Sequence, residues 1–130
     1  MNTKNNPRAA DYFDGGKSYK PKRKKQSPTN ELTKAVLKLV RSKPQCFAWR
    51  VNSTGVVRNG QYTYSGATSG VPDVEACIAG KYVGFEIKVG RDKMRESQIK
   101  FKEKITEANG VYVIVKEIDD VINYFSEIDF

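Results

Sequence analysis

The chain has 130 residues, with 23 lysines and arginines against 15 aspartates and glutamates, so its formal net charge is +8. This length suits one domain, and because the sequence has no run of about 18 apolar residues and no signal-peptide pattern, we expect a soluble, cytoplasmic protein with no membrane partner. Histidine is absent. Its absence excludes a histidine general base, histidine-assisted zinc chemistry and a Ser-His-Asp triad.

Most of the positive charge lies in the first 25 residues, whose eight basic and two acidic side chains leave only +2 for the rest of the chain. We expect residues 1–26 to be a tail that is disordered in isolation, because it is polar and lacks periodicity. Its basic run would contact DNA phosphates without reading bases, or would simply keep the terminus soluble. The basic residues of this run are Lys20, Lys22, Arg23, Lys24 and Lys25.

A helix is predicted from Ser27-Pro28, a cap residue followed by a proline suited to a first helical turn. Its apolar stripe comprises Leu32, Ala35, Val36, Leu39 and Val40. Glu31 borders this stripe and could look across at the sheet as an additional carboxylate. Glutamates in a first turn also occur because the helix dipole favours them, so both interpretations stay open.

A strand is predicted from Cys46 to Val51, with Phe47, Trp49 and Val51 on one side and Arg50 on the other. The glycine-rich stretch 52–70 is predicted to be a long polar connection, of the kind that often binds ligands. Within it, Arg58, Tyr62 and Tyr64 could approach a DNA backbone or a distorted base. A surface hairpin or a dimer contact is an equal alternative.

Two short runs, 73–79 and 82–89, flank Gly80-Lys81 and predict a β-hairpin. A turn at Gly80-Lys81 would place Glu75 opposite Glu86 and Asp73 opposite Lys88. The apolar face would pack on a core, and the other face would carry these charges at one end. Two opposed glutamates cost up to ~1 kcal/mol unless a cation lies between them. Carboxylates beside an ammonium indicate a magnesium site next to a water-activating group, with a plain solvated face as the alternative.

A second helical pattern carries Met94, Gln98, Phe101, Ile105 and Ala108 at helical steps and is closed by Asn109-Gly110. The Gln98 amide on this stripe needs hydrogen-bond partners, which could be backbone or water, or the charged end of the hairpin. The apolar run 111–115 then predicts a central strand, and Asp119-Asp120 opens a short helix.

In this order, the motifs resemble the virus-type replication-repair nuclease (VRR-NUC) family of the PD-(D/E)XK superfamily. The matching features are Glu31, Arg50 and Asn52, Ser69-Gly70-Val71-Pro72-Asp73, Glu86-Ile87-Lys88, and Gln98, over about residues 27–118. The resemblance implies an α/β fold with a restriction-endonuclease-like core, in which helices flank a mixed β-sheet of four or more strands. We assign this domain to residues 27–130.

The resemblance also implies a role for each site residue. Asp73 and Glu86 would bind one or two Mg²⁺ or Mn²⁺ ions, with the backbone carbonyl of Ile87 as a further ligand. Lys88 would orient or deprotonate the attacking water, and Gln98 would order it.

Two other glutamates are candidates for the same site. Glu31 would join the metal shell directly or through water. Glu75 departs from the small or apolar residue usual in the family, so it is either an extra metal ligand or a neighbour paired with Lys88 or Lys81. Arg50 and Asn52 join the residues expected to contact DNA.

The implied activity is that of a Mg²⁺-dependent DNA endonuclease that hydrolyses phosphodiester bonds and has no organic cofactor. The resemblance favours a homodimer that cuts branched DNA such as Holliday junctions, inside a bacterial or phage-infected cell. One alternative is a non-catalytic DNA-binding or phage accessory protein on the same fold. Another is a flap or single-strand nuclease.

Overall fold

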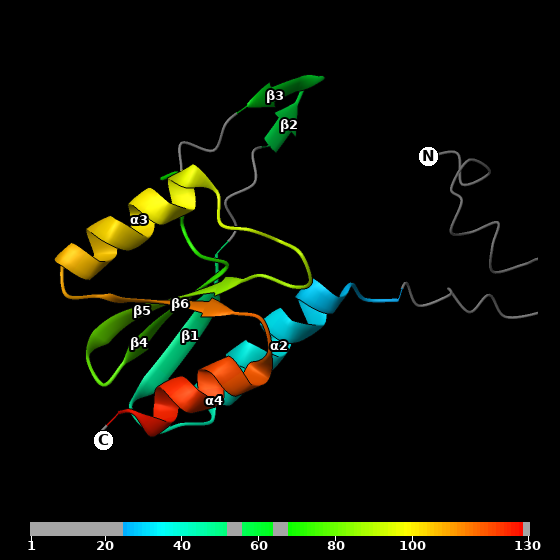
Figure 1. Cartoon of the computed structure of the whole chain (residues 1–130). Coiled ribbons are helices and arrows are strands. Elements are labelled where there is room, and N and C mark those ends of the chain that lie inside the picture. The colour runs from blue at the N-terminus through cyan, green and yellow to red at the C-terminus, as the bar shows by residue number, and fades with distance from the viewer. Residues whose placement is uncertain (1–24, 52–55, 64–67, 129–130) are drawn as a thin grey trace, which may run out of the picture.

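The computed structural model describes residues 25–51, 56–63 and 68–128 (Figure 1). In chain order its elements are α2 (Pro28–Arg41), β1 (Cys46–Arg50), β2 (Val56–Arg58), β3 (Gln61–Thr63), β4 (Val74–Ile78), β5 (Lys81–Ile87), α3 (Glu96–Glu107), β6 (Val111–Val115) and α4 (Ile118–Ser126). The predicted start of the first helix is confirmed, because the Ser27 side chain caps α2 by accepting a hydrogen bond of 3.2 Å from the Asn30 N–H.

Four strands form one mixed, open sheet in the order β1-β4-β5-β6. β5 and β6 are parallel, whereas β1, β4 and β5 are antiparallel neighbours. Helices α2 and α4 lie on one face of this sheet and α3 lies on the other (Figure 1). The predicted α/β class, with a mixed sheet of four strands flanked by helices, is therefore confirmed. None of the described helices is long and apolar enough to cross a membrane.

The hydrophobic core lies between the sheet and the helix pair α2 and α4. It is built from alternate residues of the strands, together with one stripe of each helix, which is the pattern of a sheet with one covered apolar face. Its buried members are Val36, Val40, Ala48, Val74, Ala76, Ile78, Val83, Phe85, Ile87, Val115, Val121 and Phe125. This face supplies most of the apolar burial and so holds the strands that carry the site.

The register predicted for the β4–β5 hairpin is wrong by two positions. The turn residues are Ala79 and Gly80, with φ of 50° and 80°, so β4 ends one residue earlier than predicted. Glu75 consequently lies opposite Gly84 rather than Glu86. A shift of two residues keeps every side chain on its predicted face, which is why the division into an apolar and a charged face survives the error.

Two other boundaries differ from the sequence prediction. The stretch predicted as an irregular connection contains the two-stranded hairpin β2–β3, which is separate from the main sheet. Helix α3 begins at Glu96, so Met94 precedes it, and the left-handed Asn109 (φ 66°) follows its end as expected.

Candidate functional site

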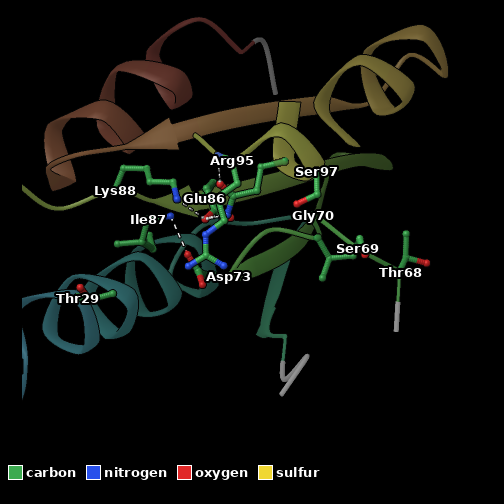
Figure 2. Close-up of a pocket in the computed structure, with 12 residues that line it drawn as sticks. Thr29, Thr68, Ser69, Gly70, Asp73, Glu86, Ile87, Lys88, Arg95 and Ser97 are labelled. Atoms are coloured by element: carbon green, nitrogen blue, oxygen red, sulfur yellow. Dashed lines mark hydrogen bonds and ion pairs between the residues drawn. The ribbon is translucent and has the colours of Figure 1, made fainter. Parts of the chain in front are cut away.

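A pocket of about 400 Å³ opens where the end of β5, the chain entering β4 and the first turn of α3 meet (Figure 2). Its lining residues are Thr29, Thr68, Ser69, Gly70, Val71, Asp73, Glu86, Ile87, Lys88, Arg95, Ser97 and Gln98. Five of the residues predicted for the site, Asp73, Glu86, Ile87, Lys88 and Gln98, are thus brought together. They come from sequence positions up to 25 residues apart, and the hairpin and α3 are what unite them.

The Asp73 side chain takes over where the pairing of β4 with β5 ends. The last paired residues are Val74 and Phe85, so the Ile87 N–H lies beyond the ladder of backbone hydrogen bonds. The Ile87 N–H donates instead to Asp73 Oδ2 at 2.9 Å (Figure 2). Because the N–H and C=O of one strand residue point toward the same neighbouring strand, the Ile87 carbonyl faces the Asp73 side as well.

Glu86 is the most buried acidic group of the pocket, with an exposed fraction of 3%. Its Oε1 accepts a hydrogen bond from Gln98 Nε2 at 2.7 Å, and its Oε2 accepts one from the Tyr112 hydroxyl at 3.3 Å. Lys88 Nζ lies 3.4 Å from Oε1. The carboxylate is therefore held in one orientation by groups from α3, β6 and the end of β5.

Burial and, after it, the nearby negative charge of Asp73 together raise the pKa of Glu86 from its ordinary value of 4.5 to about 7. The positive charge of Lys88 and the hydrogen bonds from Lys88 and Tyr112 oppose this rise without cancelling it. Two carboxylates are thus held close together with too little positive charge to balance them. A site of this kind is stabilised by an additional cation.

Gln98 links the helix to the sheet at this point. Its Oε1 accepts a hydrogen bond of 2.9 Å from the Arg95 backbone N–H, which closes half of a capping box at the start of α3. This bond leaves the Nε2 group free to donate to Glu86, so Gln98 uses both of the partners considered from the sequence, the backbone and the charged end of the hairpin. The partner is Glu86 itself, and not Lys88.

Two glycines allow the chain to close around the pocket. A Cβ on Gly70, whose φ is +82°, would lie 2.1 Å from the Ser97 carbonyl oxygen, so the backbone before β4 touches the first turn of α3. A Cβ on Gly84 would lie 2.7 Å from Pro72 Cγ, so the missing side chain in β5 makes room for Pro72. Both contacts fix the position of Asp73 relative to Glu86.

Glu31 and Glu75 do not line the pocket. Glu31 is exposed on α2, where the neighbouring Thr29 reaches the pocket in its place. The Glu75 carboxylate accepts a hydrogen bond of 2.7 Å from the hydroxyl of Tyr82, which lies on β5 nearer the hairpin turn than the pocket does. No group of three or more His, Cys, Asp or Glu side chains suited to a metal occurs in the part of the chain that the structure describes.

Few of the residues predicted to contact DNA can be placed. Lys25 is exposed, and Arg50 is exposed at the end of β1 with its Nη2 donating to Asn30 Oδ1 at 2.6 Å. The remaining residues either lie outside the described ranges or have side chains that the structure does not describe. The first group comprises Lys20, Lys22, Arg23, Lys24, Asn52 and Tyr64, and the second comprises Arg58 and Tyr62.

Two residues of the site were not predicted from the sequence. Tyr112 sits in the apolar run of β6, and its hydroxyl needed a partner, which was the available signal. Arg95 occupies the N-cap position of α3, and its side chain is directed into the pocket on the Asp73 side (Figure 2). An arginine is unusual at an N-cap, where residues with short oxygen-bearing side chains are preferred.

In comparisons with known proteins, the chain matches no protein-family model and no curated protein. The donor set itself suits Mg²⁺ or Mn²⁺: two carboxylates and a backbone carbonyl are hard oxygen ligands, and Mg²⁺ commonly keeps several waters beside one or two carboxylates. The raised pKa of Glu86 fits the same ion, because a bound cation would supply the positive charge that the pair lacks.

Proposed function

We propose that this protein is a Mg²⁺- or Mn²⁺-dependent DNA endonuclease of the PD-(D/E)XK type, with a VRR-NUC-like, restriction-endonuclease-like core. The observation that carries the proposal is the convergence of Asp73, Glu86 and Lys88 in one polar pocket at the ends of two neighbouring strands. A protein that only binds DNA would have no catalytic reason to keep these three residues together.

The residues divide the work of phosphodiester hydrolysis. Asp73, Glu86 and the Ile87 carbonyl would hold the metal, which when bound neutralises charge on the phosphate and activates water. Lys88, only 8% exposed, lies beside Glu86 Oε1 and would orient the attacking water in the pocket. Gln98 and Tyr112 fix the Glu86 carboxylate, and Arg95 lines the opening where a phosphate would enter.

The substrate proposal goes further than the pocket and depends on the resemblance. The positive charge of residues 1–25 and the open pocket support DNA as substrate. Cleavage of branched DNA, such as a Holliday junction, by a homodimer is the form that the resemblance favours, since one small domain supplies one site and two paired strands need two.

The test is incubation of the full chain with junction, flap, duplex and single-stranded DNA in Mg²⁺, Mn²⁺ or EDTA. We expect cleavage that depends on the metal and is lost in both Asp73→Asn and Lys88→Ala. Lys102→Ala, which removes an exposed lysine of α3 away from the pocket, is the matched control and should cut normally. Equal cleavage by wild type and Lys88→Ala would disprove the proposed chemistry.

The homodimer is tested separately by native mass or small-angle scattering at micromolar concentration, with and without junction DNA. A monomer under every condition would remove the dimer from the proposal while leaving the site untouched. Binding of all substrates without cleavage in either metal would instead support the non-catalytic DNA-binding protein.

A further inference from the structure

Two aromatic side chains lie exposed on the same face of the sheet as the pocket. Phe47 is 60% exposed and Trp49 is 38% exposed, although both belong to a strand of the main sheet. Their rings are stacked, with centroids 6.1 Å apart and planes inclined by 30°. Exposed rings of this size are costly in water unless something covers them in function, so this aromatic pair requires an explanation.

The strand register places the aromatic pair next to the carboxylates. Trp49 is directly opposite Glu75, and Phe47 is opposite Cys77, on β4. One step further along, the Val51 N–H donates to the Asp73 backbone carbonyl at 2.9 Å. Residues two apart on a strand share a face, so Val51, Trp49 and Phe47 lie on one face. The aromatic pair therefore extends along the outermost strand β1, starting beside Asp73.

One basic side chain, that of Arg41, lies against the pair at the free edge of β1. The Arg41 guanidinium carbon lies 5.6 Å from the centre of the Phe47 ring, and Arg41 Nε donates to the Ala48 carbonyl at 2.8 Å. The two neighbouring basic residues contact the other side of the sheet, where Lys43 Nζ lies 5.7 Å from the centre of the Phe125 ring and Arg50 Nη2 donates to Asn30 Oδ1. Flat apolar rings beside fixed positive charge are complementary to nucleotide bases joined by phosphates.

A second copy of the chain fits this surface less well. Arg41 occupies the outward-facing carbonyl of Ala48, which blocks the edge of β1 against the addition of another strand. Two rings also offer far less area than the ~800 Å² per partner that a stable interface buries. The other large exposed apolar residues of the described chain, Ile99 and Ile122, belong to helices α3 and α4.

We infer that Phe47 and Trp49 are a stacking site for one or two unpaired bases of the DNA strand that enters the pocket. The inference rests on the proposed nuclease function and sharpens its substrate, because bases of a fully paired duplex are stacked on one another and cannot cover these rings. Flaps, gaps, junction centres and single strands would therefore bind more tightly than a blunt duplex.

Trp49 is the only tryptophan of the chain, so its fluorescence reports on this site directly. In EDTA or Ca²⁺, we expect a short oligothymidine to quench the emission of the full chain. A blunt duplex of equal length should bind, as followed by anisotropy of labelled DNA, without comparable quenching. Binding of oligothymidine without quenching, or equal quenching by the duplex, would overturn the inference.

Variants separate stacking from general binding. Phe47→Leu and Trp49→Leu should weaken oligothymidine binding by about 5- to 100-fold and leave duplex binding unchanged, while Trp49→Phe should restore most of the loss. Ile99→Ala, on α3, is the exposed apolar control. Circular dichroism checks that each variant folds. If wild type is a dimer by native mass and the two leucine variants are monomers, the aromatic pair is a contact between copies and the inference is wrong.

Failure of the inference and failure of the proposed function give different results. Metal-dependent cleavage without quenching of the Trp49 fluorescence by oligothymidine would reject the stacking site alone. Quenching by oligothymidine with no cleavage of any substrate in Mg²⁺ or Mn²⁺ would reject the nuclease and keep the stacking site as part of a binding protein.

Discussion

The charge of Glu86 should cost the metal-free protein stability, and replacing Glu86 by glutamine should remove that cost. The pKa of Glu86 is about 7 in the folded protein, against an ordinary value of 4.5. The folded state therefore binds a proton that the unfolded state has already lost. As the pH rises from 4.5 to 7, the free energy of unfolding should fall by about 3 kcal/mol, since each pKa unit corresponds to ~1.4 kcal/mol.

The assay is urea unfolding of wild type and Glu86→Gln in EDTA, at intervals from pH 4.5 to 8. The free energy of unfolding of the variant, relative to that of wild type, should increase by about 3 kcal/mol between pH 4.5 and about 7 and level off above that. The reason is that only wild type acquires the uncompensated charge. Glu103→Gln, which changes an exposed glutamate of α3, is the control and should give a curve parallel to wild type.

Mg²⁺ extends the same test. At a hundredfold excess over its dissociation constant, a ligand of the folded state adds ~2.7 kcal/mol of stability. At pH 8, Mg²⁺ should therefore restore most of the stability that wild type loses between pH 4.5 and 7. Glu86→Gln should gain little from the ion. Parallel pH curves for wild type and Glu86→Gln in EDTA would refute the reasoning that burial and Asp73 strain this carboxylate.

Three further perturbations address the frame and the surface of the site. Gly70→Ala should lower the free energy of unfolding in urea by more than ~3 kcal/mol, because its Cβ would meet Ser97 O. Gly80→Ala, with an equally positive φ but open space around it, should cost only ~1 kcal/mol. Equal losses would contradict the close contact at Gly70. Tyr112→Phe should remove about 1 kcal/mol and lower kcat more than it raises KM for DNA, whereas an unchanged kcat would deny the hydroxyl a role in holding Glu86. Deleting residues 1–25 should weaken DNA binding and flatten its salt dependence without changing the metal requirement; an unchanged salt slope would reject a role for the tail.

Much of the frame could be predicted from local patterns. Ser27-Pro28 identified the start of α2, and the spacing of apolar and charged residues identified both faces of the β4–β5 hairpin. The exact turn could not be predicted, because nothing in the sequence shows that Ala79 adopts a left-handed conformation. An error of two residues then changed the partner of every charge while leaving its face unchanged.

The composition of the site was predictable only in part, for a related reason. Asp73, Glu86 and Lys88 share a face at the end of one hairpin, so local periodicity was enough to unite them. Whether Glu31 reaches them depends on how α2 packs against the sheet, which no local pattern contains. Tyr112 comes to Glu86 through the parallel pairing of β5 and β6, a contact that sequence spacing does not reveal.

Helix α3 owes its place on the sheet partly to the acid that it covers. None of its residues is fully buried, so apolar packing holds it less firmly than it holds α2 or α4, and the Gln98–Glu86 hydrogen bond is one of its ties to the sheet. When Glu86 gains or loses a proton or a cation, the strength of that tie changes. How firmly α3 is held against the sheet therefore depends on the charge that the pocket holds, which couples the local stability of this helix to occupancy of the site.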